Sequence, residues 1–382
     1  MPTRDPIARI AQNLLTLQRI GNTVDAQLEP IMQELFGQIV ADLASIDPTG
    51  PGAGRWKRYR TDQLVAEVAR RVRAARGEWD TALRGLLAKT GRQQGVFAAD
   101  TLIFSVGNPG LVRPTPITQA RLRAILNTEP FHGRPLSEWA DSLERSTRDG
   151  VVQQIRLGMS REESIPEIAR RLRGEQRGWL RRDTATGQFV PKGRAGAVVA
   201  PRFVGGVLTT TTRNAETIAR TAVNYVSNVA QMETYEANSR VLDGVQFSAT
   251  LDLSTTFICA SLDGATWKFG DAEIQQPPLH PRCRSALLPV IAWERLGLDA
   301  PDEGMRAART VRVDAEGHVT EGRTTRVQSG TVFEQWMRDR PAKAQDAWFG
   351  PARGRLFRSG ELTFRDLVSR DGRVIPLAEL TG

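Results

Sequence analysis

The chain has 382 residues, 40% of them hydrophobic and 25% charged, which is the composition of a soluble protein with room for two or three domains. No apolar run reaches the length of a membrane span, and the N-terminus lacks the basic start and apolar stretch of a signal peptide. Two cysteines argue against a disulfide scaffold and indicate a reducing compartment such as the cytoplasm. The net charge of +9 and the pI of about 10.3 favour acidic partners.

The positive charge is carried almost entirely by arginine, with 47 Arg and five Lys among the 52 basic residues. Arginine suits bidentate phosphate contacts, although a GC-rich genome produces the same bias without functional meaning. The basic side chains at 170–194 predict salt-sensitive, sequence-independent binding to double-stranded DNA. The alternative is that they dock on an acidic protein surface. We call the basic side chains of this stretch the basic segment. They are Arg170, Arg171, Arg173, Arg177, Arg181, Arg182, Lys192 and Arg194.

Residues 6–46 carry apolar side chains at three- and four-residue spacing, which predicts helices that pack on a partner helix. Gly21 interrupts this stripe and Pro30 threatens a kink, so we expect two packed helices rather than a coiled coil. The stripe could be buried against a helix at 61–90, or it could dock on another protein. Its members are Ile7, Ile10, Leu14, Leu17, Val24, Leu28, Ile31 and Leu35.

The remaining periodicities predict an α+β protein whose first part is mainly helical. Gly107, Pro109 and Pro114 indicate an extended connection at 105–116, and Gly174 is placed to end a helix. The other predicted elements are helices at 61–90, 117–127, 136–157 and 164–173, a hairpin around 183–190, a helix at 213–239, a strand at 245–251, a surface loop or hairpin at 299–328, and short helices after 331.

The densest group of chemically distinctive residues lies between positions 252 and 284, where both cysteines and one of the three histidines occur. A Cys, a His and a second Cys brought together could bind a metal, perform thiol chemistry or lock a small fold. The other histidines, His132 and His318, stand in surroundings typical of the surface. The residues of the group are Asp252, Thr255, Cys259, Asp263, Gly264, Pro277, Pro278, His280, Cys283 and Arg284.

We expect Asp252, Cys259, His280 and Cys283 to converge in one small site, because the prolines between them restrict the backbone. Two thiolates, an imidazole and a carboxylate form a mixed ligand set that zinc accepts. Hydrogen bonds alone could also hold the group, with Asp252 bound to backbone amides or to Thr255. Thiol catalysis or a disulfide is a third interpretation, although the Cys–His spacing is unlike that of cysteine proteases. The occupant of the site stays open.

The same residues resemble the signature of the phage head morphogenesis family of Mu F-like minor head proteins. In that family the pattern reads roughly Asp-x-x-Thr-x-x-x-Cys-x-x-x-Asp-Gly, followed by Pro-Pro-x-His-x-x-Cys-Arg. The helix that carries Ala219-Arg220-Thr221 and the C-terminal tail are also similar. Many relatives have cysteine where this chain has Thr256 and Ser285, so two of the soft ligands that zinc prefers are missing here.

The resemblance implies a minor head protein without enzymatic activity, which acts at the portal vertex during procapsid assembly in the host cytoplasm and resides in the virion. The implied partners are the portal protein, the major capsid or scaffolding protein and packaged double-stranded DNA, with no membrane. The predicted division is a helical N-terminal region at 1–115, a compact α+β Mu F-like module at 116–298, a polar linker or hairpin at 299–330 and a small helical C-terminal tail at 331–382.

Two other functions remain open. Mu F-like modules also occur fused to effector enzymes, so a nuclease or similar enzyme is one alternative. The sequence shows neither paired carboxylates at catalytic spacing nor an additional toxin-sized domain. The other alternative is a host DNA-binding protein with a degenerate zinc ribbon, which requires base selectivity that the arginine distribution does not supply.

Overall fold

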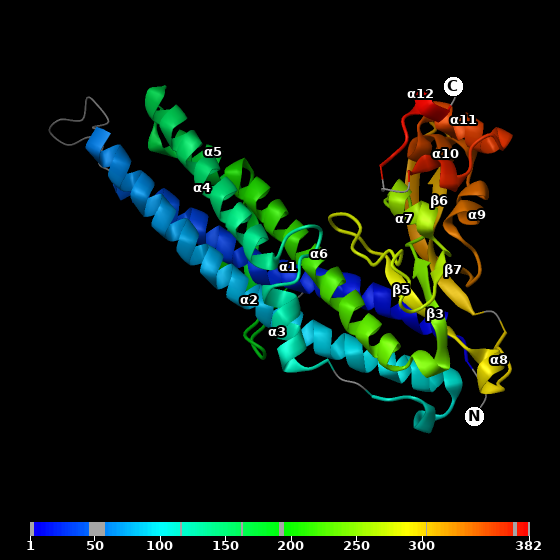
Figure 1. The fold of residues 1–382 in the computed structure, drawn as a ribbon. Coiled ribbons are helices and arrows are strands. Elements are labelled where there is room, and N and C mark those ends of the chain that lie inside the picture. Colours follow the sequence, from blue (N-terminus) through cyan, green and yellow to red (C-terminus); the bar gives the residue numbers. More distant parts are fainter. Residues whose placement is uncertain are drawn as a thin grey trace. The chain divides into compact units, whose positions relative to one another are not determined.

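The computed structural model describes residues 4–45, 58–114, 117–161, 163–190, 195–302, 304–369 and 373–380. The break expected at 47–52 and two members of the basic segment, Lys192 and Arg194, lie outside these residues. Figure 1 shows the helices and strands of the described chain. The chain forms two compact units. Unit 1 consists of residues 1–18, 90–118 and 224–382, and unit 2 consists of residues 19–89 and 119–223.

Helix α1 (Pro6–Ser45) is one continuous element, so the expectation of two packed helices at 6–46 is wrong. Pro30 lies in its interior and is buried, as is Gly21, which lies against the side chain of Arg220. Proline and glycine destabilise a helix interior by about 3 and 1 kcal/mol, and packing along the apolar stripe offsets this cost. Most of the stripe is buried within this chain, as the internal alternative predicted; its buried members are Ile10, Leu17, Val24, Leu28 and Leu35.

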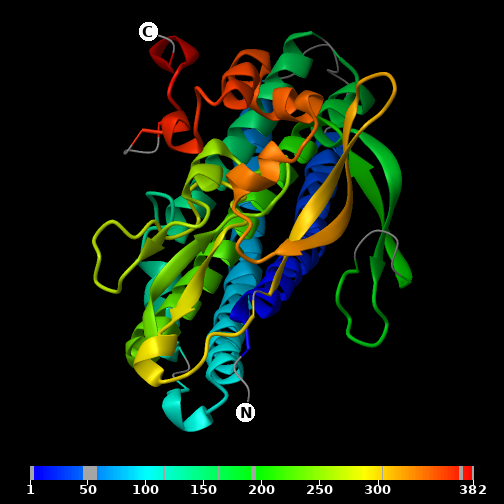
Figure 2. The same cartoon turned by 90° about the vertical axis from the view of Figure 1, so that its right-hand side faces the viewer.

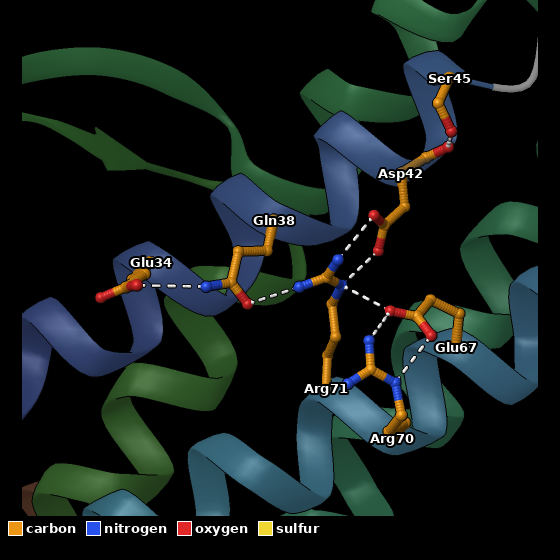
Figure 3. A network of polar contacts seen from close by, with 7 residues as sticks. All are labelled: Glu34, Gln38, Asp42, Ser45, Glu67, Arg70 and Arg71. Atoms are coloured by element: carbon orange, nitrogen blue, oxygen red, sulfur yellow. Dashed lines mark hydrogen bonds and ion pairs between the residues drawn. The ribbon is translucent and has the colours of Figure 1, made fainter.

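Helix α2 (Arg58–Val106) extends well beyond the predicted 61–90, and a 3-10 turn, η1 (Pro109–Leu111), follows in the expected connection. In unit 2 a polar network joins the first two helices (Figure 3). The Arg71 guanidinium donates to Asp42 on α1, with one contact at 2.8 Å, and to Gln38 Oε1 at 2.9 Å. Glu67 on α2 lies 3.1 Å from Arg71 Nε, so a single cation neutralises carboxylates from both helices.

The rest of unit 2 follows the predicted order. Helices α3 (Gln119–Asn127), α4 (Leu136–Ser160) and α5 (Ile165–Arg173) agree with expectation within a few residues. Strands β1 (Glu175–Arg182) and β2 (Ala197–Val204) then pair antiparallel and form the hairpin, longer than the predicted 183–190 (Figure 2). Gly174 has a φ of +75°, and a Cβ there would lie 2.1 Å from the Val204 carbonyl oxygen. Glycine is therefore required where α5 passes into the hairpin.

Helix α6 (Gly206–Ala237) contributes residues to both units. Within unit 2, Arg220 donates to Asp25 on α1, with the Nε contact at 2.7 Å. Within unit 1, the Gln94 amide oxygen on α2 accepts from Asn13 on α1 and from Gln231 on α6, both at 2.7 Å. These buried bonds fix the register of three helices, because a displaced helix would leave buried amides without partners.

The sheet of unit 1 has the order β4–β3–β5, with both pairings antiparallel. Its central strand β3 (Leu242–Ser248) follows the 3-10 turn η2 (Ser239–Val241) and replaces the predicted 245–251. The others are β4 (Thr266–Trp267) and β5 (Ala286–Ile291), with the short helix α7 (Phe257–Leu262) between β3 and β4. The sheet packs with the ends of α2 and α6 in one apolar core.

The final third begins with the short helix α8 (Trp293–Leu296) and continues into an antiparallel hairpin of β6 (Met305–Val313) and β7 (Val319–Gln328), as expected for 299–328. The helical tail is also confirmed, but it is not a loose appendage. Its aromatic side chains share a second buried core with Leu251 and Ala260. Figures 1 and 2 show the short helices of the tail in orange and red. The tail elements are α9 (Phe333–Arg338), α10 (Ala342–Phe349), α11 (Pro351–Ser359), η3 (Phe364–Leu367) and α12 (Leu377–Leu380).

The two units divide the chain differently from the predicted domains. The regions 1–115 and 116–298 each contribute to both units, while the hairpin and the tail belong to unit 1. An apolar stripe indicates that a helix is buried, but it does not indicate in which core. Because α1, α2 and α6 each contribute residues to both units, the boundary between the units cannot be predicted from the stripes. Among the described helices, none is long and apolar enough to span a membrane.

The Arg71 network generates a stability prediction. Replacing Arg71 with Ala should lower the free energy of unfolding by roughly 1–3 kcal/mol, between the costs of breaking exposed and buried ion pairs. Arg70 is the matched control, because its side chain is 68% exposed and its partner Glu67 is on the same helix. Arg70→Ala should change stability very little. Urea unfolding followed by circular dichroism measures both, and equal losses in the two variants would contradict the inter-helix role of Arg71.

Candidate functional site

The two cysteines meet at the junction of helix α7 with the sheet core of unit 1. Cys259 is the third residue of α7, and Cys283 lies just before β5. Their exposed fractions are 1% and 3%, and both belong to the sheet core. Trp348 from the tail donates its indole N–H to the Thr255 carbonyl at 2.9 Å, directly before α7. The position of Cys259 therefore depends on the sheet on one side of α7 and on the tail on the other.

His280 completes a three-residue cluster. Its Nε2 atom lies 3.2 Å from Cys259 Sγ, which lies 3.7 Å from Cys283 Sγ. His280 Nδ1 lies 2.9 Å from the Pro281 carbonyl oxygen. A carbonyl can only accept, so Nδ1 carries the hydrogen and the Nε2 lone pair of the neutral ring faces the sulfur atoms. The two thiols are free of a disulfide.

The loop that carries His280 and Cys283 is held from both ends. The Cys283 amide donates to the His280 carbonyl at 3.1 Å, and Arg282 between them has a φ of +59°. On α6, Asn224 Nδ2 donates to the Ser285 carbonyl at 3.0 Å, and Asn228 Oδ1 accepts from the Leu287 amide at 3.2 Å. These asparagines were not predicted from the sequence, although two amides one turn apart on a buried helix face were a usable signal.

Asp252 is not part of the Cys/His group, and this corrects the expectation of a four-residue site. Its carboxylate accepts two hydrogen bonds from the Arg284 guanidinium, one of them at 2.7 Å, and one from the Ser254 amide at 3.0 Å. The Thr255 hydroxyl donates to the Thr250 carbonyl at 2.5 Å and lies 3.2 Å from the Asp252 carboxylate. Arg284 therefore neutralises the carboxylate that we expected as a fourth ligand. The three donor atoms of Cys259, His280 and Cys283 lie within 4.8 Å of one another.

Asp263 and Gly264 form a second structural feature at the end of α7. The Asp263 side chain is fully buried, and its two oxygens accept from the Ala249 and Phe333 amides, each at 2.7 Å, and from both terminal nitrogens of Arg306 at 3.1 Å. Gly264 has a φ of +88°, and a Cβ there would lie 2.7 Å from Val332 Cγ1. Arg306 was missed because it lies in a stretch whose arginines otherwise face solvent.

The cluster titrates as a unit, because its charges lie in contact. The hydrogen bond from Cys259 lowers the pKa of the Cys283 thiol well below its ordinary value, and the neighbouring imidazole adds to this against the opposing effect of burial. The same hydrogen bond and burial raise the pKa of Cys259. Burial lowers the pKa of His280, but the contact with Cys283 and the Pro281 carbonyl outweigh it, so the net shift is upward. The pKa values of the two thiols therefore shift in opposite directions, because they share one hydrogen bond.

The basic segment divides into two groups. Arg171 binds Glu163, and Arg173 stacks over the Phe203 ring at 4.2 Å, so these two serve the fold of unit 2. The others that the structure describes are exposed, namely Arg170, Arg177, Arg181 and Arg182. Of these, Arg177 lies 3.2 Å from Glu175.

The buried carboxylate of Asp263 yields a second stability prediction. Asp263→Ala leaves the Arg306 charge and two backbone amides without their acceptor, so the free energy of unfolding should fall by about 3–5 kcal/mol. Asp263→Asn keeps an acceptor oxygen and should cost less. The control is Asp243→Ala, which removes the exposed ion pair with Arg295. Denaturant unfolding measures the three variants, and a loss for Asp263→Ala as small as for Asp243→Ala would contradict this account.

Comparison with known proteins connects this geometry to a family. Residues 145–288 match the family model described as Phage Mu protein F like protein. No curated protein and no solved structure matches the chain significantly. The matched stretch begins within α4 and ends within β5, so it contains the β1–β2 hairpin, α6 and the complete Cys/His cluster. Over residues 145–288, which are less than half of the chain, the protein is therefore similar to the phage Mu protein F like family.

Proposed function

We propose that this chain is a minor head protein of a tailed phage that acts at the portal vertex during procapsid assembly and remains in the virion. The observation that carries the proposal is the family match, because its residues include the whole site built by α6, α7 and the loop before β5. Polar side chains of that stretch make contacts that hold the fold together. Arg220 joins α6 to α1, and Asn224 and Asn228 hold the start of β5.

We further propose that the role is structural and not catalytic. A nucleophilic thiol needs an accessible sulfur and a base that a third group orients. The Pro281 carbonyl does orient the His280 ring, but both sulfur atoms are buried in an apolar core, so the accessible nucleophile is missing. This arrangement supports a cluster that stabilises α7 and its loop. It gives no support to the alternative of an effector-type nuclease.

The β1–β2 hairpin is the surface that best suits contact with other head components. Trp179 on β1 is 55% exposed, and Val198 and Val199 on β2 are 51% and 47% exposed. Gln33 and Glu29 on α1 hold this hairpin through Phe203 and Arg202. Exposed arginines stand beside the exposed apolar side chains, so the hairpin can offer both phosphate contacts and apolar contacts.

Co-purification tests the portal assignment. The chain should elute with the portal ring of the same phage when the two proteins are produced together. Val198→Ser combined with Val199→Ser should weaken this association, because it removes apolar contact area. The control is Val96→Ser on α2, a similarly exposed valine at 53%. Failure of the unmodified chain to associate with the portal, in a sample where both proteins are folded, would contradict the proposal.

We propose that the hairpin also contacts packaged DNA without sequence preference. Replacing Arg170, Arg177, Arg181 and Arg182 by Ser should weaken DNA binding and flatten its dependence on salt. The slope of log affinity against log salt should fall by roughly 0.9 for each phosphate contact removed.

The matched control replaces four other exposed arginines by Ser, so that its net charge falls by the same amount. They are Arg312, Arg323, Arg326 and Arg355. Its slope should change less than that of the hairpin variant. Fluorescence anisotropy with two unrelated DNA duplexes measures both proteins. Equal slopes for the unmodified chain and the hairpin variant would assign these arginines to protein contacts instead.

A further inference from the structure

We propose that Cys259, His280 and Cys283 bind one zinc ion, and that the hydroxyl of Thr256 faces the fourth ligand position. This inference does not depend on the proposed function. It rests on three observations, which are the spacing of the donor atoms, the orientation of the imidazole and the surroundings of Thr256.

The spacing of the donor atoms fits a tetrahedral site. Two sulfur atoms at about 2.3 Å from a zinc ion and at the tetrahedral angle lie about 3.7–3.8 Å from each other. The observed separation of Cys259 Sγ and Cys283 Sγ is 3.7 Å, and the third donor lies 3.2 Å from Cys259 Sγ. A disulfide would need a sulfur–sulfur distance of about 2.05 Å. The geometry therefore points to two separate sulfur ligands.

The imidazole is oriented as a metal-binding histidine usually is. The ring donates Nδ1–H to the backbone carbonyl of Pro281, which leaves Nε2 as the atom that faces Cys259, with Cys283 Sγ within 4.8 Å. In metal sites this second hydrogen bond fixes the tautomer and the ring orientation. The left-handed backbone at Arg282 and the bond between Cys283 and His280 hold the two loop ligands in one turn.

Thr256 precedes Cys259 by three residues at the start of α7, so the two side chains lie on the same face of this helix. It is the N-cap residue of α7 but makes no side-chain capping bond, and its buried hydroxyl has no hydrogen-bond partner among the described residues. A buried hydroxyl without a partner is costly, and a metal ion or its bound water would satisfy it. Two sulfurs and one imidazole select zinc over magnesium or calcium, which prefer oxygen ligands.

Metal analysis of the full chain tests this directly. The chain, purified under reducing conditions without chelator, should contain close to one zinc per molecule by plasma mass spectrometry. Cys283→Ser and His280→Ala should lose most of it, whereas the control His318→Ala should keep it. His318 lies in an exposed group with Asp314 and Glu316, so this control also excludes zinc held at that hairpin. Zinc that follows His318 and not His280 would overturn the proposal.

Thr256→Cys provides a test that does not depend on loss of folding. It places a thiolate at the fourth position, so zinc should leave for a chromogenic chelator at least about tenfold more slowly than from the unmodified chain. Ser254→Cys adds an exposed thiol nearby as the control and should leave the rate unchanged. A metal-free, fully folded chain that also gives no thiolate-to-cobalt absorption after cobalt addition would overturn the assignment. So would equal release rates for Thr256→Cys and the unmodified chain.

Discussion

The buried carboxylate of Asp263 is the interaction on which the architecture of unit 1 depends most. It accepts hydrogen bonds from the Ala249 amide, from the Phe333 amide at the start of α9 and from the Arg306 guanidinium on β6. A charge in an apolar interior is tolerated only when it is fully paired, so its three partners must all be in place. One side chain therefore joins the end of β3, α7, the β6–β7 hairpin and the tail.

This joint explains why α7, although only Phe257–Leu262, can serve two cores. Cys259 packs in the sheet core with the ends of α2 and α6, while Ala260 packs with the aromatic side chains of the tail. The Trp348 bond to Thr255 fixes the same helix from the tail side. A change in the tail would reach the Cys/His cluster through α7, which makes the cluster and the tail one structural assembly.

Unit 2 uses a different means of stabilisation. Its long helices are joined by ion pairs between partly buried side chains, such as Arg71 with Asp42 and Arg220 with Asp25. Arginine suits this use because its planar guanidinium can serve several acceptors at once. The high arginine content thus has a structural component. Among the described members of the basic segment, Arg170, Arg177, Arg181 and Arg182 have exposed side chains.

The sequence by itself determined the local elements and the group of residues that meet at the site. Spacing of apolar residues located the helices, and the order of Cys, His and Pro located the cluster, because these signals depend on near neighbours in the chain. Tertiary structure decided the rest. In the folded chain Asp252 binds Arg284, and Asp263 binds Arg306. Helix α1 is continuous and largely buried although it contains Gly21 and Pro30. Each of these outcomes depends on which residue, distant in the sequence, lies next to a buried polar atom or apolar face. A local sequence pattern does not specify these long-range contacts.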